Sequence, residues 1–264
     1  LAGAAIAVSG VLFQAVLKNP LADPGIIGIS SGASFTAVII TAFAPTLYFF
    51  TPIAAFAGGV VAFFMVYCLS WKGGLSPMRI ILTGVAVNSL FTGLSSALNS
   101  MSGGDRTGVA AIVEANITQK TWDDVMTLLP YVIAGLFLAM LFTQECNLLS
   151  LEDKTARSLG VNVNVTRIVI SLVAVLLASI STAVAGAISF LGLIVPHIGR
   201  ILIGSDHKML LPFSAVFGAF TFLLADTIGR TIAAPNEVSA AVIMSVVGGP
   251  FFILLLRRSG KYGK

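Results

Sequence analysis

The stretch VTRIVISLVAVLLASISTAV, residues 165–184, decides the fold of this chain. Its 20 residues include a single charge, Arg167, and its apolar residues do not alternate with polar ones. A helix of about 20 residues spans the ~30 Å hydrocarbon core of a bilayer, whereas a strand of a membrane barrel requires alternation. The stretch therefore predicts a transmembrane α-helix.

Eight further apolar segments are similar to this one. Together they give nine predicted spans, near residues 1–18, 26–44, 47–70, 77–99, 125–144, 165–184, 186–203, 209–233 and 239–256. The chain is 57% hydrophobic and 10% charged, with a mean hydropathy of +1.00, whereas soluble domains carry about 25% charged residues. Polar residues are too few to cover a water-facing surface, and this excludes a soluble protein. We expect an all-α integral membrane protein, built as a polytopic helical bundle.

The loops between the spans predict the orientation, because Lys and Arg accumulate on the cytoplasmic side. When the loops alternate between the two sides, only three of the 15 basic residues, Arg106, Lys120 and Arg230, fall outside. The other twelve share the side that holds the charged segment 150–162 and the C-terminus, which we expect to be cytoplasmic. Nine spans then put Leu1 outside. The basic residues are scattered without interleaved aromatics, so nucleic acid is not an expected partner.

The largest predicted outer loop runs from about residue 100 to residue 124. Its second half, EANITQKTWDDV at 114–125, predicts a short amphipathic helix that lies at the membrane interface. Trp122 suits that level, because its ring is apolar while its N–H needs a polar partner.

The segment SLEDKTARSLGVN, residues 150–162, interrupts the apolar chain with a cluster of charges. Four charged side chains fall within six residues, at Glu152, Asp153, Lys154 and Arg157. Ser150 followed by Asp153 fits a capping box, in which both side chains satisfy free N–H groups at a helix start. Gly160 is a typical helix stop. The segment therefore predicts a short, capped helix.

This helix would have about three turns, with one apolar face. The residues expected to share that face are Leu151, Thr155, Ala156 and Leu159. Two interpretations stay open from the residues alone. The helix is either a solvated connector between spans, or a docking helix that transmits force between a soluble partner and the membrane helices.

A second charged pair lies inside a predicted span. Asp226 precedes Arg230 by four residues, which favours an ion pair on one helix face. Charges inside a membrane are costly and mark functional candidates, although a structural pair near the outer surface is an equal alternative. His197 and His207 fall near the cytoplasmic end without a second ligand at metal-site spacing, so no metal site is expected.

Three classes of membrane protein compete at this point. No G-x-x-x-x-G-K-[ST] loop occurs, so an ATP-driven process would need a partner that binds ATP. An ion-coupled secondary transporter would need acidic residues along an intramembrane pathway, and Asp226 is the only such residue in the later spans. A membrane enzyme would need a cluster of His, Asp or Glu, which the sequence does not contain. We therefore expect no catalytic residues in this chain and do not expect an enzyme.

Long blocks spread over the chain carry a family resemblance. They are GAAIAVSGVLFQAVLKNPLADPGIIGISSGA at 3–33, ILTGVAV at 81–87, LSLEDKTARSLGVN at 149–162, AGAISFLGLIVPHIGRILIGSDHKMLLP at 185–212, LLADTIGR at 223–230 and VGGPFFILLLRR at 247–258. In these blocks the chain resembles the FecCD/BtuC-type permeases of bacterial ABC importers. The resemblance implies a BtuC-like bundle with ten helices in the family and about nine here. Residues 1–264 would form a single transmembrane permease domain without the family's first helix.

The resemblance also implies a coupling helix and a docking residue. Residues 150–160 match the family's cytoplasmic helix that fits a cleft on the ATPase. The residues expected to pack there are Leu151, Ala156, Leu159 and Gly160. Those expected to make polar contacts are Glu152, Asp153 and Arg157. Arg230 matches a basic residue that meets a glutamate of the substrate-binding protein.

By the same resemblance, the turn before the fourth segment in this chain borders the inner gate. Its residues are Leu75, Ser76 and Pro77. The helix that begins near Pro77 is expected to line the translocation pathway. Its polar side chains are Asn88, Ser89, Ser95, Ser96 and Asn99.

The function implied by the resemblance is import through a bacterial cell membrane, in a multi-pass subunit. The expected cargo is an iron(III)-siderophore, with haem or cobalamin as the alternatives within the family. The implied partners are a second permease subunit, two cytoplasmic ABC ATPases, an extracellular or periplasmic substrate-binding protein and membrane lipid. No cofactor is expected in this chain, because ATP and Mg²⁺ would be bound by the ATPases.

Overall fold

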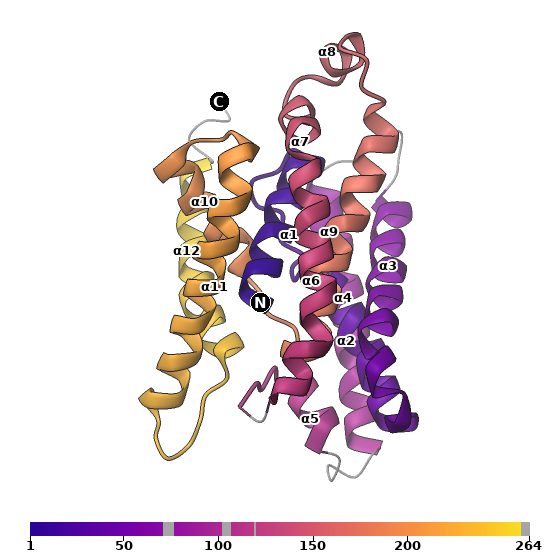
Figure 1. Cartoon of the computed structure of the whole chain (residues 1–264), viewed down its shortest axis with the longest axis vertical. Helices are drawn as coiled ribbons and strands as arrows, with labels where there is room; N and C mark the ends of the chain where they lie inside the picture. The colour runs from indigo at the N-terminus through magenta and orange to yellow at the C-terminus, as the bar shows by residue number, and fades with distance from the viewer. Residues whose placement is uncertain (71–76, 102–106, 119, 260–264) are drawn as a thin grey trace.

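The computed structural model describes residues 1–70, 77–101, 107–118 and 120–259, and every regular element in these ranges is helical. In chain order the elements are α1 (Ala2–Leu17), α2 (Ile29–Phe43), the 3₁₀ helix η1 (Pro45–Phe50), α3 (Thr51–Ser70), α4 (Pro77–Met101), α5 (Thr107–Val113), α6 (Trp122–Leu141), α7 (Thr143–Leu149), α8 (Asp153–Ser158), α9 (Val163–Ala185), α10 (Leu191–Ile203), α11 (His207–Ile232) and α12 (Ala240–Ser259). The long helices stand side by side, with α8 at one end of the bundle and α5 at the other (Figure 1).

All nine predicted spans coincide with helices, and this confirms the fold class. Those long and apolar enough to cross a membrane are Pro45–Ser70, Met78–Met101, Trp122–Leu141, Val163–Ala185 and His207–Ile232. Shorter apolar helices of 10–17 residues are Ala2–Leu17, Ile29–Phe43, Leu191–Ile203 and Ala240–Leu255. Helices α2 and α10, with 15 and 13 residues, are shorter than the spans predicted over 26–44 and 186–203, whereas α12 continues to Ser259 over 20 residues.

Breaks in the backbone explain why α2 and α10 start late. Gly28 precedes α2 with φ 87°, and Gly186 (φ 76°) and Phe190 (φ 68°) hold the chain before α10 out of the helical conformation. Irregular backbone is tolerated at membrane depth only where protein buries it. Most residues of these two connections, 22–28 and 186–190, are buried or half-buried in the bundle.

The axis of the bundle is α1, in which every residue from Ala2 to Val16 is buried. Helices α6, α9, α10 and α11 pack around it. Two glycines permit the closest approaches. A methyl group on Gly10 would lie 2.0 Å from the carbonyl oxygen of Gly192 in α10, and one on Gly3 would lie 2.5 Å from that of Gly218 in α11. Small residues at helix contacts allow such approaches in lipid.

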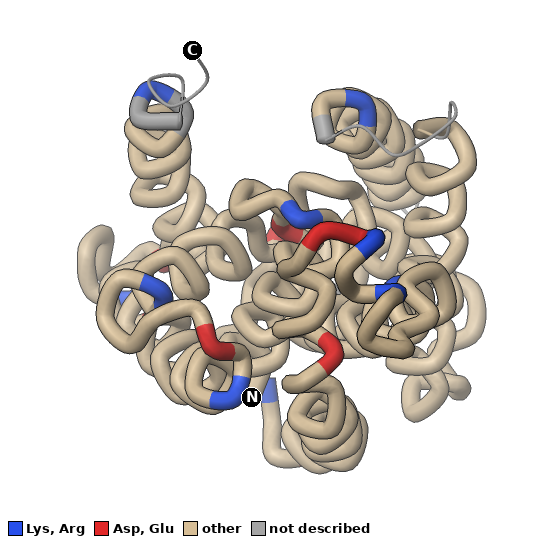
Figure 2. The backbone as a smooth tube through the Cα atoms, turned by 90° about the horizontal axis from the view of Figure 1, so that it is seen from above, with Lys and Arg blue, Asp and Glu red and all other residues tan. Residues whose placement is uncertain are grey.

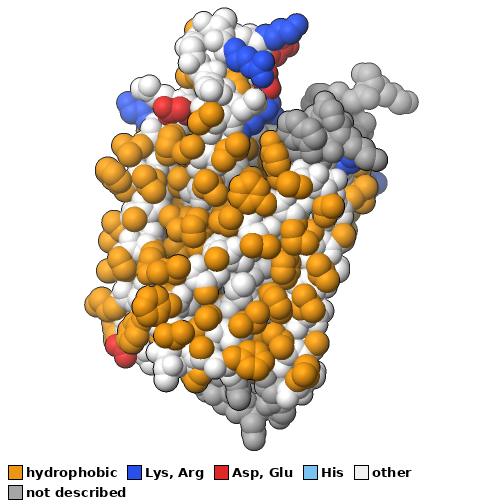
Figure 3. Space-filling view, turned by 90° about the vertical axis from the view of Figure 1, so that its right-hand side faces the viewer, with side chains coloured by type: hydrophobic (Ala, Val, Ile, Leu, Met, Phe, Trp, Pro, Cys, Tyr) orange, Lys and Arg blue, Asp and Glu red, His pale blue; other side chains and the backbone are white. Residues whose placement is uncertain are grey.

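The surface agrees with a multi-pass protein of the cell membrane. Apolar side chains cover the flank of the bundle, and the charged ones gather at its ends (Figure 3). The α8 end, seen in Figure 2, carries basic residues of the side predicted to be cytoplasmic. Among them, Lys18 and Arg167 contact the α8 segment, and Lys208 lies at the start of α11. Because the loop charges predict that this end faces the cytoplasm, we name it the cytoplasmic end.

The predicted interfacial helix over 114–125 was wrong. Helix α5 ends at Val113, before that segment, and the described residues from there to Thr121 are not helical. A capping box does occur here, because the main-chain N–H of Thr121 donates to Asp124 Oδ2 over 2.8 Å and starts α6. Trp122 is 77% exposed at that helix start, and its place at the membrane interface stays a prediction.

The Gly10 contact predicts an unequal effect of two identical substitutions. Gly10→Ala should lower the stability of the folded chain by about 1–3 kcal/mol, since its methyl group meets main chain that cannot move aside. Gly93→Ala in α4 is the matched control, because nothing lies within 4 Å of the added methyl group. The check is the thermal unfolding midpoint of each purified variant. A midpoint for Gly10→Ala at or above that of Gly93→Ala would contradict the packing argument.

Candidate functional site

A short helix projects from the cytoplasmic end of the bundle, where the charged segment was predicted to form one. After α7, residues 150–152 form a turn, and α8 then runs from Asp153 to Ser158 before the chain enters α9 (Figure 1). The helix is shorter than the predicted three turns, because it starts three residues after Ser150.

The predicted capping box at Ser150 and Asp153 was wrong. Ser150 is the C-terminal cap of α7, and its hydroxyl donates to the carbonyl of Cys146 over 3.2 Å. The residue that caps the start of α8 is Glu152, whose side chain makes no capping bond. The carboxylate of Asp153 is instead drawn to cations of two membrane helices.

Asp153 fixes α8 to the bundle through two ion pairs. Its Oδ1 lies 2.7 Å from Lys18 Nζ, at the end of α1, and 2.9 Å from Arg167 Nη2, in the first turns of α9. Lys18 also donates to the carbonyl of Leu151. The hydrogen bond from Lys18, helped by the charge of Arg167, holds the pKa of Asp153 below its ordinary value. One carboxylate thus joins α1, α8 and α9.

The other end of α8 is closed as predicted. Gly160 has φ 86°, and its N–H donates to the carbonyl of Arg157 over 3.0 Å. The N–H of Val161 donates to the carbonyl of Ala156 over 3.2 Å. This pair of bonds is the Schellman motif, which favours glycine because the left-handed conformation strains other residues. The helix therefore has a defined end rather than a frayed one.

The side chains of α8 divide into those that face the bundle and those that face outward. Ala156 is only 1% exposed, whereas Leu151 and Leu159 are 40% and 59% exposed. The prediction that these three share one face with Thr155 was therefore wrong, because Ala156 alone is turned inward. Glu152, Arg157 and Gly160 are also exposed. Of the expected coupling residues, Asp153 and Ala156 contact the protein's own bundle and the other five remain available.

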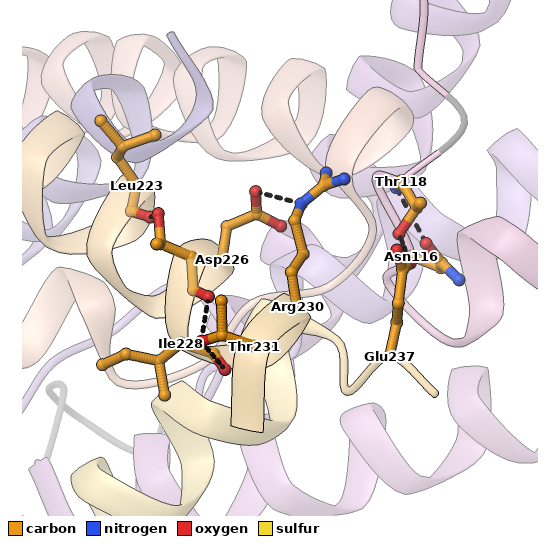
Figure 4. A network of polar contacts seen from close by, with 9 residues as sticks. Asn116, Thr118, Leu223, Asp226, Ile228, Arg230, Thr231 and Glu237 are labelled. Carbon is orange, nitrogen blue, oxygen red and sulfur yellow. Dashed lines mark hydrogen bonds and ion pairs between the residues drawn. The ribbon is translucent and has the colours of Figure 1, made fainter. Parts of the chain in front are cut away.

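The predicted pair of Asp226 and Arg230 forms at the opposite end, on α11. Arg230 Nε donates to Asp226 Oδ2 over 2.8 Å, and Arg230 is partly exposed. Close by, the hydroxyl of Thr118 donates to Glu237, which joins the chain before α6 to the chain before α12 (Figure 4). The terminal guanidinium nitrogens of Arg230 reach beyond the Asp226 carboxylate, toward the Thr118 side of this network (Figure 4).

The expected pathway residues of α4 fall on different faces of that helix. Ser89 and Ser96 are exposed, Asn88 and Asn99 are half-buried, and Ser95 is buried. Ser89 and Ser96 stand seven residues apart and so share one open face. Of the expected gate residues, Leu75 and Ser76 lie outside the described residues, and Pro77 begins α4.

Two residues near the ends of α1 and α10 were not predicted from the sequence. Asp23, in the NPLADPG block, is fully buried, and its Oδ2 accepts from the N–H groups of Gly25 and Ile26. Arg200 donates to Gln14 and so ties α10 to α1. A carboxylate before Pro-Gly was a readable turn signal for Asp23, but no sequence pattern pairs residues 186 positions apart. Among the described residues, no group of three or more His, Cys, Asp or Glu could hold a metal.

Comparison with known proteins supports a transport role. The model of the FecCD transport family matches residues 1–258. The "Probable heme-iron transport system permease protein IsdF" of Staphylococcus aureus, strains Newman and COL, is 40% identical over 257 residues. The match covers 97% of this chain and 78% of each relative.

Solved structures show the same architecture. One, "An inward-facing conformation of a putative metal-chelate type ABC transporter", matches with a TM-score of 0.81 and 27% identity, over 97% of this chain and 83% of that one. Another, "PsaBC from Streptococcus pneumoniae in complex with Fab", has a TM-score of 0.62 and 19% identity, over 96% of this chain and 88% of that one. The second supports the fold alone.

The ion pairs of Asp153 predict a pH-dependent hold on α8. The folded-state pKa is depressed, so the stabilisation is complete above the ordinary pKa of 3.8 and is lost as the pH falls through the lower folded value. Asp153→Asn should abolish this dependence and speed amide exchange in α8, at a cost below about 1 kcal/mol in global stability, because the pair is solvent-screened.

Hydrogen exchange followed by mass spectrometry over residues 150–162 measures the effect directly. Glu152→Gln removes the neighbouring acid, for which the described residues show no ion pair, and is the control. Equal exchange in the Asp153→Asn and Glu152→Gln variants would show that the ion pairs do not hold α8.

Proposed function

The chain belongs to the FecCD transport family, and from this premise we propose that it imports an iron chelate with energy supplied by separate ATPases. It is an ABC transporter permease, a transport component rather than a catalytic subunit. The observation that carries the proposal is α8, a closed helix that projects at the cytoplasmic end and is fixed by one carboxylate to both α1 and α9.

In this proposal α8 is the coupling helix. Asp153 and Ala156 attach it to the permease, and the outward side chains of Glu152, Arg157 and Leu159 meet the ATPase. Leu151 and Gly160 extend the contact at the two ends of the helix. A helix attached at its base and closed at its end moves as a rigid piece, so displacement by the ATPase would reach α1 and α9.

The remaining partners follow from the surfaces that the bundle leaves open. A second permease subunit, as a copy or a paralogue, would face the exposed stripe of α4 that carries Ser89 and Ser96, and the cargo would pass between the two. A substrate-binding protein would dock at the outer end, where Arg230 offers its terminal nitrogens to an acidic side chain. Two ATPases would bind the ATP and Mg²⁺, with no cofactor in this chain.

Two cargoes are candidates. A ferric siderophore is the cargo expected from the family resemblance. Haem is favoured by the 40% identity to relatives named as probable haem-iron permeases. Both are iron chelates.

Leu159→Asp should separate ATP hydrolysis from uptake. A charge placed at an apolar contact costs about 1.4 kcal/mol or more, so uptake should fall by about tenfold or more while the ATPase keeps hydrolysing ATP. The fold should survive, because Leu159 is exposed. The measurement is uptake and ATPase activity of the complete transporter in proteoliposomes. Lys208→Gln, an exposed cytoplasmic change away from α8, is the control, and normal coupled uptake in Leu159→Asp would contradict the assignment.

Arg230→Gln should weaken docking of the substrate-binding protein by about tenfold at low salt and by much less at high salt, since the contact is a charge pair. Surface plasmon resonance on the reconstituted transporter measures this. Lys120→Gln removes another outer cation and serves as the control. Affinity that is unchanged at low ionic strength would remove Arg230 from the docking surface.

Cargo and energy source can be tested together in the same vesicles. Uptake of ⁵⁵Fe-haem and of a ⁵⁵Fe-siderophore should differ. An excess of the same chelate without the label should reduce uptake only for the true cargo. Replacing the Walker lysine of the partner ATPase should abolish uptake. Uptake that persists without that lysine would instead identify an ion-coupled secondary transporter.

A further inference from the structure

A polar pocket of about 310 Å³ lies beside the α8 segment, at the cytoplasmic ends of α1, α10 and α11. Its lining residues are Gln14, Ala15, Lys18, Asn19, Pro20, Ser150, Arg200, Ser205 and His207. Two of these carry positive charge and none is acidic. Apart from Lys18, which also holds Asp153, the proposed coupling and docking residues do not line this pocket, so its chemistry is a separate question.

Arg200 supplies a charge that the described residues do not neutralise. Its guanidinium is half-buried and donates to the neutral side chain of Gln14, and the ion pairs found in the described ranges do not include it. Charges removed from water are normally paired. The remaining guanidinium donors form a planar fork that suits a phosphate or a carboxylate.

His207 also lines the pocket, with its ring held in a fixed orientation. The side chain of Asn147 donates to Asp206 over 2.8 Å, which fixes its amide so that Oδ1 faces His207. That oxygen lies 2.6 Å from His207 Nδ1 and accepts the main-chain N–H of His207 over 3.0 Å, so Nδ1 carries the proton in the neutral ring. Nε2 is left as an acceptor, and in the described structure it is buried with no partner.

The pocket therefore presents cationic donors, while the unpartnered Nε2 of His207 is closed off within its wall. A phosphate group would satisfy Arg200 and the free N–H of Lys18. The level of the pocket in the membrane also suits a lipid. It lies at the cytoplasmic helix ends, where basic pockets between membrane helices bind lipid head groups.

We propose that this pocket binds the phosphate of an anionic phospholipid of the cytoplasmic leaflet, such as phosphatidylglycerol. Occupancy would also act on α8. Lys18 bonds both to Asp153 and to the carbonyl of Leu151, so a phosphate that shares Lys18 would loosen the attachment of α8. Binding of the lipid does not depend on what cargo the protein carries.

Native mass spectrometry of the complete transporter tests the proposal. Short-chain phosphatidylglycerol should bind about tenfold more tightly than phosphatidylcholine of the same chain length. Arg200→Gln should remove most of that preference. Asn19→Asp should do the same without loss of the fold, because the new carboxylate can still accept the N–H of Leu21 while adding negative charge to the pocket wall. Lys208→Gln removes a nearby cation that does not line the pocket, and should keep the preference.

Further measurements distinguish the source of the phosphate. If the lipid is the ligand, inorganic phosphate competes weakly and phosphatidylglycerol binding persists. If inorganic phosphate displaces the lipid at equal concentration, the site takes free phosphate and the lipid assignment is overturned. Equal binding of the two lipids, or an unchanged preference in both pocket variants, would also overturn the proposal. So would phosphatidylglycerol binding that occurs only after the ATPase is removed, since a carboxylate of the ATPase would then be the occupant.

Discussion

Close contact between α1 and two later helices organises this bundle. Lipid removes the hydrophobic drive that joins helices in water, so packing and hydrogen bonds must hold membrane helices together. Gly10 lies against the main chain of Gly192, and Gly3 lies against that of Gly218. These contacts bring α10 and α11 to α1, although the helices are separated by most of the sequence. With α6 and α9 also packed around it, α1 has no face left for lipid.

The polar side chains of α1 can be buried at low cost in free energy, because each one has a hydrogen-bond partner inside the bundle. Ser9 donates to the carbonyl of Ala174 in α9 over 2.7 Å. The amide of Gln14 donates to the carbonyls of Ala22 and Gly192 and accepts from Arg200. In a medium of low polarity, leaving such a group without a partner would destabilise the fold by more free energy than the hydrogen bond contributes. These bonds therefore fix the rotation of α1 as well as its position.

The sequence predicted features that depend on composition and missed those that depend on folding at a distance. The nine predicted spans, all of which coincide with helices, follow from hydropathy. The stop at Gly160 follows from local backbone geometry. The capping box at Ser150 failed because Asp153 finds stronger partners in Lys18 and Arg167, which lie 135 and 14 positions away along the chain. A short-range motif cannot reveal that competition.

The sequence also did not predict which face of each helix is buried. Apolar spans look alike on all sides, so periodicity did not separate Ser95, which is buried, from Ser96, which is open. In water a polar residue marks the outer face, but in lipid it marks contact with protein or a passage. The sequence of α4 contains both kinds, and only the three-dimensional packing tells them apart. Ala156 was placed on a face with Leu159 for a different reason: α8 ends at Ser158, so Leu159 lies beyond the helix.

The arrangement links the two ends of the protein through α1. Lys18, at one end of that helix, contacts both Asp153 and the main chain of Leu151. Gly3, near its other end, lies against Gly218, three turns before Arg230 on the same helix α11. Tightly packed interiors transmit displacement rather than absorb it. In the proposed mechanism, a push on α8 would therefore reach α11 through backbone contacts, without passing through a flexible side chain after Lys18. This continuity supports the proposed coupling helix over a solvated connector, the two interpretations that the residues alone left open.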